Sequence, residues 1–267
     1  MRKYTTIFAV AAIALFTLTG TSLAIDADEI VKRNLEAKGG IEKLKAMKTL
    51  YMKGKYIVQD MVGQIEVAKK APSLLSFTLT TTRGKMTQGS DGEKMWTTNP
   101  RTGFRLLEGE DFKKGLDQVL MEPLLGFKER GGSCAYVGIG DVRGDSCYKV
   151  LFIQRSGDST YSFFDIHTYR MVKVEANTPR GPAEQFFEDF REVDGFVYPF
   201  SVNVGTSGGD RKIEYDTIAV NRPISDSLFV MPDPKSVPSM AKPLPDLLCG
   251  PKERMNTLNS LKQPWLQ

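Results

Sequence analysis

The sequence predicts an α+β fold, mostly antiparallel β, with helices grouped on one side of a curved sheet. Apolar residues recur with a period of two from Thr49 onward, in short runs separated by turn residues, which is typical of antiparallel strands. Helical spacing occurs before Thr49 and again over residues 112–120. Several strands are apolar on both faces, whereas a sheet with one wet face alternates more cleanly. We therefore expect the helices to cover part of the second face.

Residues 1–24 predict an export signal. Arg2 and Lys3 supply the positive start, residues 7–18 are mostly apolar, and Ser22-Leu23-Ala24 has the small-x-small pattern of a cleavage site. The apolar run is shorter than the roughly 20 residues that a membrane helix needs. No cysteine stands near the cleavage point, so a removable signal is favoured over a lipidated one. We expect a mature chain that begins at Ile25 and is soluble in the periplasm.

Two helices are predicted before the first strand and one in the middle of the chain. Asp26 or Asp28 can cap a helix that continues to about Lys38, where Gly39-Gly40 ends it, and residues 41–47 repeat the apolar spacing. The third helix carries apolar residues at i, i+4, i+7 and i+8. These residues are Phe112, Leu116, Val119 and Leu120.

Alternating runs predict strands on both sides of the third helix. The runs before it cover residues 50–59, 64–70, 74–82, 85–88, 94–98 and 101–107, and the runs after it cover 135–142, 148–154, 160–166, 171–177, 183–193, 197–205 and 212–221. All-β domains of about 200–250 residues commonly form one unit, so one domain is expected.

The charge balance argues against a nucleic-acid partner. The chain has 36 Lys and Arg against 32 Asp and Glu, a formal charge of +4, and loss of Arg2 and Lys3 lowers it further. A nucleic-acid binder is expected to carry a stronger basic stripe.

Three cysteines, Cys134, Cys147 and Cys249, would enter an oxidising compartment after export. Cys134 and Cys147 are equidistant from Gly140-Asp141, so a turn centred there would pair them in a disulfide. A turn at residues 143–145 would not, and the sequence leaves both registers open. Cys249 is left over in either case.

No residue pattern predicts an enzyme, a cofactor or a metal site. His167, the chain's one histidine, stands in a polar turn without a nucleophile signature. Glu188 and Asp189 are adjacent in a strand and point to opposite faces. Arg143-Gly144-Asp145 is treated as an ordinary hairpin turn, and no glycine-rich phosphate loop is present.

Apolar residues on different strands predict either a filled core or a partly open cavity. For a single residue the filled core is the simpler interpretation, but a sheet with few helices to plug it commonly holds a ligand. The set comprises Phe77, Leu75, Leu79, Trp96, Phe152, Phe163, Phe187 and Phe200.

Gly89-Ser90-Asp91-Gly92-Glu93-Lys94-Met95-Trp96-Thr97-Thr98-Asn99-Pro100 resembles the Ser-Asp-Gly-Lys-x-x-Trp-x-x-Asn-Pro segment of the LolA-type periplasmic lipoprotein carriers. Other segments resemble the broader group of outer-membrane lipoprotein-sorting proteins in the same order along the chain. They are residues 37–40 with Leu44 and Lys45, residues 189–195 leading to Pro199, and residues 226–229 before Met231-Pro232.

The resemblance implies an incomplete half β-barrel of about eleven strands over residues 25–232, with helices as a lid over a hydrophobic concave face. A proline-rich tail, residues 233–267, follows. The implied function is a periplasmic carrier or binding protein for lipid, lipoprotein acyl chains or a similar amphiphile, which could also meet membrane-bound donor or acceptor proteins. The alternative is an envelope regulatory or sensor module that acts through protein contact.

Residues of the implied binding site follow from the same resemblance. The cavity and lid residues are Phe77, Leu79, Trp96, Leu116 and Leu120, and Lys70 is a candidate for contact with a headgroup. The carriers have a basic residue directly before a proline, where this chain has Ala71 before Pro72. We expect Trp96 to lie in a strand that follows an Asp91-Gly92 turn.

Overall fold

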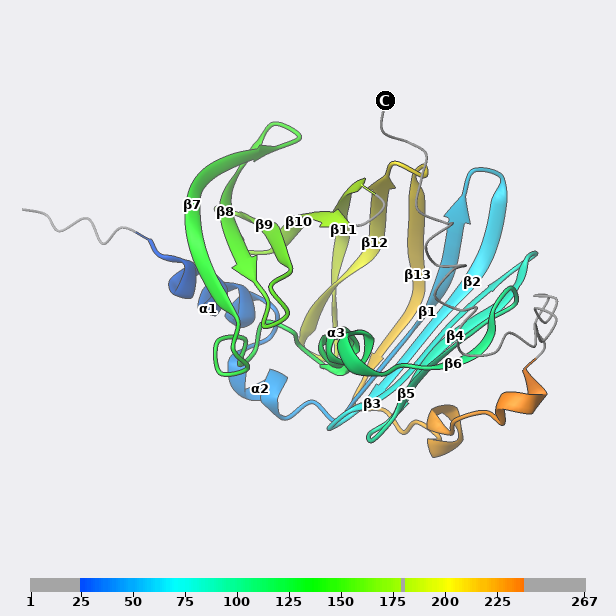
Figure 1. Ribbon diagram of the computed structural model, residues 1–267. Helices are drawn as coiled ribbons and strands as arrows, with labels where there is room; N and C mark the ends of the chain where they lie inside the picture. The colour runs from blue at the N-terminus through cyan, green and yellow to red at the C-terminus, as the bar shows by residue number, and fades with distance from the viewer. Residues whose placement is uncertain (1–24, 179–180, 238–267) are drawn as a thin grey trace, which may run out of the picture.

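The computed structural model describes residues 25–178 and 181–237, which form one large antiparallel sheet with three α-helices (Figure 1). The predicted export signal, Cys249 and most of the proline-rich tail lie outside the described residues. Thirteen strands are arranged in the order β6-β5-β4-β3-β2-β1-β13-β12-β11-β10-β9-β8-β7. The sheet is open, because its two edge strands, β6 and β7, are not paired with each other.

The elements follow the predicted order. The α-helices are α1 (Ala27–Ala37), α2 (Ile41–Lys45) and α3 (Gly109–Val119), and two short 3-10 helices are η1 (Asp226–Phe229) and η2 (Pro234–Ser236). The strands before α3 are β1 (Thr49–Val58), β2 (Met61–Lys70), β3 (Leu74–Thr81), β4 (Gly84–Asp91), β5 (Met95–Asn99) and β6 (Gly103–Leu106). The strands after it are β7 (Ser133–Val142), β8 (Asp145–Ile153), β9 (Ser159–Asp165), β10 (Met171–Thr178), β11 (Gly181–Val193), β12 (Phe196–Thr206) and β13 (Arg211–Val220).

The α+β class with a half-barrel sheet is confirmed, with thirteen strands where the resemblance implied about eleven. Asp26 is the residue that caps α1, since its carboxylate accepts a hydrogen bond from the Glu29 backbone N–H. Trp96 lies in β5 after a turn in which the Asp91 carboxylate accepts from two backbone N–H groups and Gly92 has a φ of 98°. Only glycine adopts that backbone conformation without a steric penalty.

The chain crosses the hollow of the sheet between β6 and β7. These strands follow one another in sequence but stand at opposite edges of the sheet, so the connection that contains α3 has to pass over one face. Figure 1 shows α3 between the two ends of the curved sheet. Topology therefore places this helix in the hollow, whatever its intrinsic stability.

The face of β1–β5 and β13 that contacts α2 and α3 is called the inner face below, and the opposite one the outer face. Cross-strand pairing puts Leu50, Lys69, Leu75 and Val220 in one row on the inner face. Trp96 pairs with Gly89, which pairs with Ser76 on the outer face. Side chains alternate between faces at every residue, so pairing assigns each of them to one side.

The α1–α2 connection lies beside a gap in the sheet. β12 and β13 pair only between residues 201–204 and 211–214, and the Val197 N–H at the start of β12 donates to the Lys38 carbonyl at 3.0 Å. A central hydrophobic cluster fills the region where these two strands separate. Its buried members are Leu35, Leu44, Met47, Leu50, Phe196, Phe200, Ile218 and Val220.

Cys134 and Cys147 do not form a disulfide, which corrects the register that would have paired them. Cys134 lies opposite Phe152 and Cys147 opposite Gly140, and both thiols are free. The β7–β8 turn is centred on Arg143 and Gly144, with φ of 57° and 94°. Two successive positive φ values match the twist of a two-residue hairpin, so the chain turns later than a disulfide requires.

Candidate functional site

The inner face is a continuous apolar surface across four neighbouring strands. Phe77 of β3 pairs with Val67 of β2, which pairs with Met52 of β1 and then Ile218 of β13. The next row toward the other end of these strands runs from Leu79 through Ile65 to Gly54 and Tyr215. Phe77 and Leu79 are both partly exposed. The structure therefore brings these two predicted residues together on the inner face.

α3 rests on one end of this surface. Val119 packs on Leu75, Met95 and Leu107, with Phe112 and Val67 at the border of the cluster. Gly115 allows the close approach, because a Cβ atom there would stand 2.7 Å from Met95 Cε. The sequence-based stripe is thus rotated: Gly115 and Val119 face the sheet, while the predicted lid residue Leu116 is 44% exposed. The other predicted lid residue, Leu120, is the C-terminal cap of α3 and is half-buried.

Lys69 is a charged residue on the inner face that the sequence analysis did not select. Its Nζ donates a hydrogen bond to the Leu120 carbonyl at 2.7 Å, so β2 holds the C-terminal end of α3. Burial lowers the pKa of Lys69 to about 8, and the nearby Glu122 carboxylate opposes that shift. Strand alternation could have identified it, because Lys69 shares a face with Val67 and Ile65.

A second lysine, Lys38, forms an ion pair with the segment that follows α3. Lys38 Nζ lies 2.7 Å from the Glu122 carboxylate, whose side chain is only 7% exposed. The other Glu122 oxygen accepts from the Leu124 N–H at 3.1 Å. Met121, Leu124 and Leu125 pack against the central cluster. Residues 120–125, called the strap below, are therefore held by two lysines from different elements.

Trp96 and Lys70 lie on the outer face, away from Phe77 and Leu79. A Cβ atom on Gly89 would stand 2.3 Å from Trp96 Cζ2, so the indole lies flat over that glycine, and it is 3% exposed. Lys70 Nζ contacts the Asp226 carboxylate of η1 at 2.5 Å. The structure does not bring these two residues to the predicted cavity.

The polar residues considered for catalysis do not converge. His167 is exposed in the β9–β10 turn, where the Asp165 carboxylate accepts from its backbone N–H and from Thr168. Glu188 contacts Asn203, and Asp189 contacts Arg191. Over residues 25–178 and 181–237, no group of three or more His, Cys, Asp or Glu side chains could hold a metal ion.

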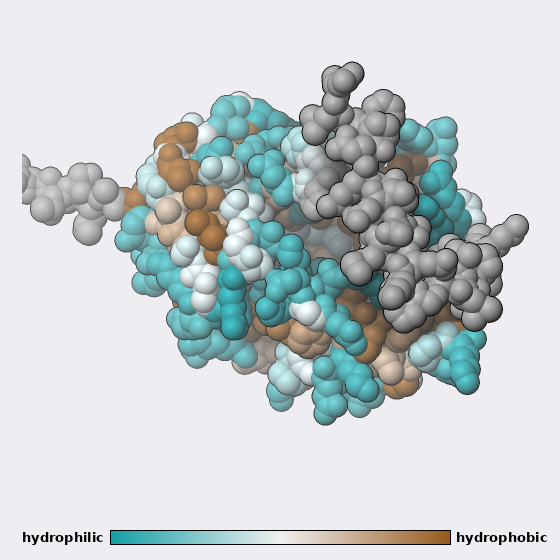
Figure 2. Space-filling model, viewed as in Figure 1, coloured by the Kyte–Doolittle hydropathy of each residue, from teal (hydrophilic) through white to brown (hydrophobic). Residues whose placement is uncertain are grey.

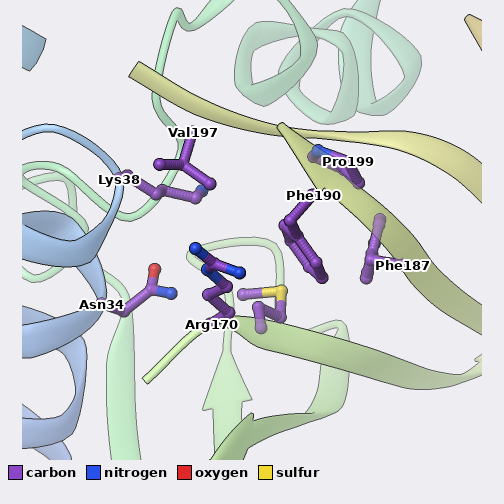
Figure 3. Close-up of a pocket in the computed structure, with 8 residues that line it drawn as sticks. Asn34, Lys38, Arg170, Phe187, Phe190, Val197 and Pro199 are labelled. Atoms are coloured by element: carbon purple, nitrogen blue, oxygen red, sulfur yellow. The ribbon is translucent and has the colours of Figure 1, made fainter. Parts of the chain in front are cut away.

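A small pocket lies between α1 and the strands β10, β11 and β12 (Figure 3). Its cavity volume is about 130 Å³. Asn34 is fully buried in the wall, and its Nδ2 donates to the Tyr169 carbonyl at 2.7 Å. The lining residues are Asn34, Lys38, Arg170, Met171, Phe187, Phe190, Val197 and Pro199.

Hydrophobic surface gathers in two places in the view of Figure 2, beside α3 and along β7 at the left edge. Among the exposed large hydrophobic residues of β7 are Val137 at 48% and Ile139 at 58%. None of the helices in the described part of the chain is long and apolar enough to cross a membrane.

Comparison with known proteins gives structural similarity only. No family model matches the sequence, and no curated protein matches it. A LolA superfamily protein from Nitrosomonas europaea aligns over 78% of this chain and 99% of its own, with 14% identity and a TM-score of 0.52. A DUF1329 family protein from Desulfovibrio piger aligns over 75% of this chain and 97% of its own, with 12% identity and a TM-score of 0.52.

Both structures align over nearly their whole length and over at least 75% of this chain, so the similarity is not confined to a single hairpin motif. Their low identity restricts the conclusion to architecture. The chain therefore has the LolA-like fold, an open antiparallel half-barrel whose hollow holds a helix.

Proposed function

We propose that this protein is an exported periplasmic carrier of an amphiphile with an acyl chain, which binds between the inner face and α3. The observation that carries the proposal is the apolar surface around Phe77, Val67 and Leu79, which extends beyond the part that α3 buries. A LolA superfamily protein shares the fold. Outer-membrane lipoprotein sorting is one process in which such a carrier would act.

The energetics of acyl-chain burial suit this surface. Burial of one CH₂ group contributes about 0.8 kcal/mol, so a chain of some 15 methylenes gains about 12 kcal/mol before ordering costs. A carrier needs a dry surface and a cover that can move. α3 meets that need, because only Val119 and Gly115 of its residues are buried.

Lys69 gives the surface a preference for an anionic headgroup. Its cross-strand neighbours are Leu50 and Leu75, and its hydrogen-bond partner in the described part of the chain is the neutral Leu120 carbonyl. The carboxylate near it, Glu122, is paired with Lys38. An anion beside Lys69 would compensate the buried charge better than a carbonyl does. A ligand that enters between β2 and α3 would therefore exchange the Leu120 carbonyl for its own anionic group.

The test is binding of palmitate and of lysophosphatidylglycerol to the mature protein, measured by native mass spectrometry and by calorimetry. Leu79→Asp places a charge on the inner face and should abolish binding, because the desolvated carboxylate opposes chain burial. Thr80→Asp is the matched control, since Thr80 is exposed on the other face of the same strand. Equal affinity of a folded Leu79→Asp protein and the Thr80→Asp protein would refute the proposal.

A protein-binding envelope module is the second candidate, because β7 exposes Val137 and Ile139 on an unpaired sheet edge. Such an edge offers free backbone groups to another strand. The two functions can be distinguished by complementation of a host strain from which the gene for this protein has been deleted. A defect with Ile139→Lys and none with Leu79→Asp would favour protein contact, and the reverse pattern would favour ligand carriage.

A further inference from the structure

The pocket beneath α1 is separate from the inner face. Its walls come from α1, the β9–β10 connection and the strands β10, β11 and β12, and none of its lining residues belongs to β1–β5 or α3. It needs an explanation of its own, because the proposed acyl-chain site does not use it.

Two cationic groups converge on this pocket. Figure 3 shows the Lys38 and Arg170 side chains pointing toward the same space from two sides, with Phe190 beyond them. Lys38 is paired with Glu122. Arg170 makes no ion pair within residues 25–178 and 181–237, and its Cζ lies 5.3 Å from the centroid of the Phe190 ring.

The charges of the lining residues and of Glu122 therefore sum to one positive unit. Lys38 and Arg170 contribute two cations and Glu122 one anion. A lysine ammonium has three donors, so Lys38 can keep Glu122 and still donate to a ligand. Arg170 has five donors in a planar fork that matches a carboxylate. The electrostatics favour a ligand with a single negative charge.

The remaining walls set the size and character of the ligand. Phe187, Phe190, Pro199 and Met171 are apolar, and the cavity volume is about 130 Å³. An apolar cavity of about 150 Å³ holds one benzene molecule. The pocket is partly open to solvent, so it has room for a group of about the size of one aromatic ring and not for a whole acyl chain.

We propose that this pocket binds a small aromatic monocarboxylate, with its ring against Phe187, Phe190 and Pro199 and its carboxylate between Arg170 and Lys38. The interaction combines ring burial with a charge-assisted hydrogen bond to a guanidinium. Lys38 also holds the strap through Glu122, so the ligand would sit next to the segment that follows α3.

The test is a titration of the ¹⁵N-labelled mature protein with benzoate and with its neutral isostere benzamide, followed by NMR. We expect saturable shifts at the amides of Asn34 and Val197 and at least about tenfold tighter binding of benzoate, as one charge-assisted contact confers. Arg170→Gln should remove that preference for benzoate.

Arg191→Gln is the matched control. Arg191 is a β11 residue whose Cζ also lies over an aromatic ring, 4.4 Å from the centroid of Phe200, but it pairs with Asp189 and does not line the pocket. It should keep the preference for benzoate. Val197→Phe, which fills the pocket without changing a charge, should abolish binding of both ligands.

Equal affinity for benzoate and benzamide would overturn the proposal, as would shifts confined to the inner face or the absence of saturable shifts up to the solubility of benzoate. Palmitate binding to the Arg170→Gln protein separates the two sites. It should be unchanged, because the acyl-chain proposal rests on other residues.

Discussion

Lys69 Nζ donates a hydrogen bond to the Leu120 carbonyl across 2.7 Å, so one lysine of the apolar inner face fixes the C-terminal end of α3. Its neighbour Lys70 points to the outer face and contacts Asp226 of η1. Two adjacent lysines thus join different parts of the chain to the two sides of one strand. This arrangement makes the attachment of α3 sensitive to the charge of Lys69.

Stability should rise with pH through the titration of Lys69. Its folded pKa is about 8, below the ordinary 10.5, so the folded state binds fewer protons than the unfolded state between these values. Below about pH 8 the folded protein bears the whole free-energy cost of burying the charged Lys69 ammonium, and this cost disappears as the pH rises toward 10.5. We expect this group to add on the order of 2 kcal/mol to the free energy of unfolding between about pH 7.5 and about pH 9.5.

Urea unfolding of the Lys69→Met protein measures that contribution. The variant should lack the rise that the parent shows, whereas Lys70→Met should keep it. The window ends below pH 10 because burial raises the pKa of Tyr51 and of Tyr215 to about 12 and that of the Cys147 thiol to about 11. Groups whose pKa is raised by folding lower the stability as they deprotonate in the unfolded chain. Identical pH slopes for the parent and Lys69→Met would contradict the assignment.

Gly115 should control how closely α3 approaches the sheet. A bulky side chain there has to displace Met95, which is 1% exposed, so Gly115→Phe should lift the helix and cost about 1–3 kcal/mol of stability. Leu116→Phe, one residue away on the exposed side, should have little effect. The measurement is thermal unfolding together with binding of a fluorescent hydrophobic probe, which should increase for Gly115→Phe alone.

Gly89 should be required by the ring of Trp96. A methyl group at this position would overlap the indole, so Gly89→Ala should destabilise the protein by about 1–3 kcal/mol. Gly205→Ala is the control, because its nearest atom would be Asp210 Oδ1 at 3.6 Å. Amphiphile affinity of the folded Gly89→Ala protein should equal that of the parent, since Trp96 lies on the outer face. A loss of affinity without a loss of stability would place Trp96 in the ligand site.

Cys147 should resist alkylation in the folded protein. It is fully buried, and burial raises the pKa of its thiol to about 11, so the reactive thiolate is scarce at about pH 8. Iodoacetamide treatment followed by peptide mapping should leave Cys147 unmodified in buffer and modify it in urea. A Cys134–Cys147 disulfide in the non-reduced peptide map would contradict the hairpin register.

Local patterns in the sequence predicted the thirteen strands and three α-helices of the described residues, but not the short 3-10 helices η1 and η2, because backbone preferences and alternation act over a few residues. The Asp91-Gly92 turn and the alternation of apolar side chains between the two faces of a strand are examples of such local features. The phase of a helix is less secure. Apolar spacing predicted that Leu116 belongs to the buried stripe of α3, but Gly115 packs closely on Met95 and turns Leu116 toward the exposed side.

The sequence by itself determined that this chain forms an antiparallel sheet with a helix across it. Only the tertiary structure decided which side of each strand belongs to the inner face, because a shift of one residue moves every side chain to the other face. It selected Lys69 over Lys70, put Trp96 outside and separated Cys134 from Cys147. It also assembled the pocket of Asn34, Arg170 and Phe190 from segments far apart in sequence, which no local pattern encodes.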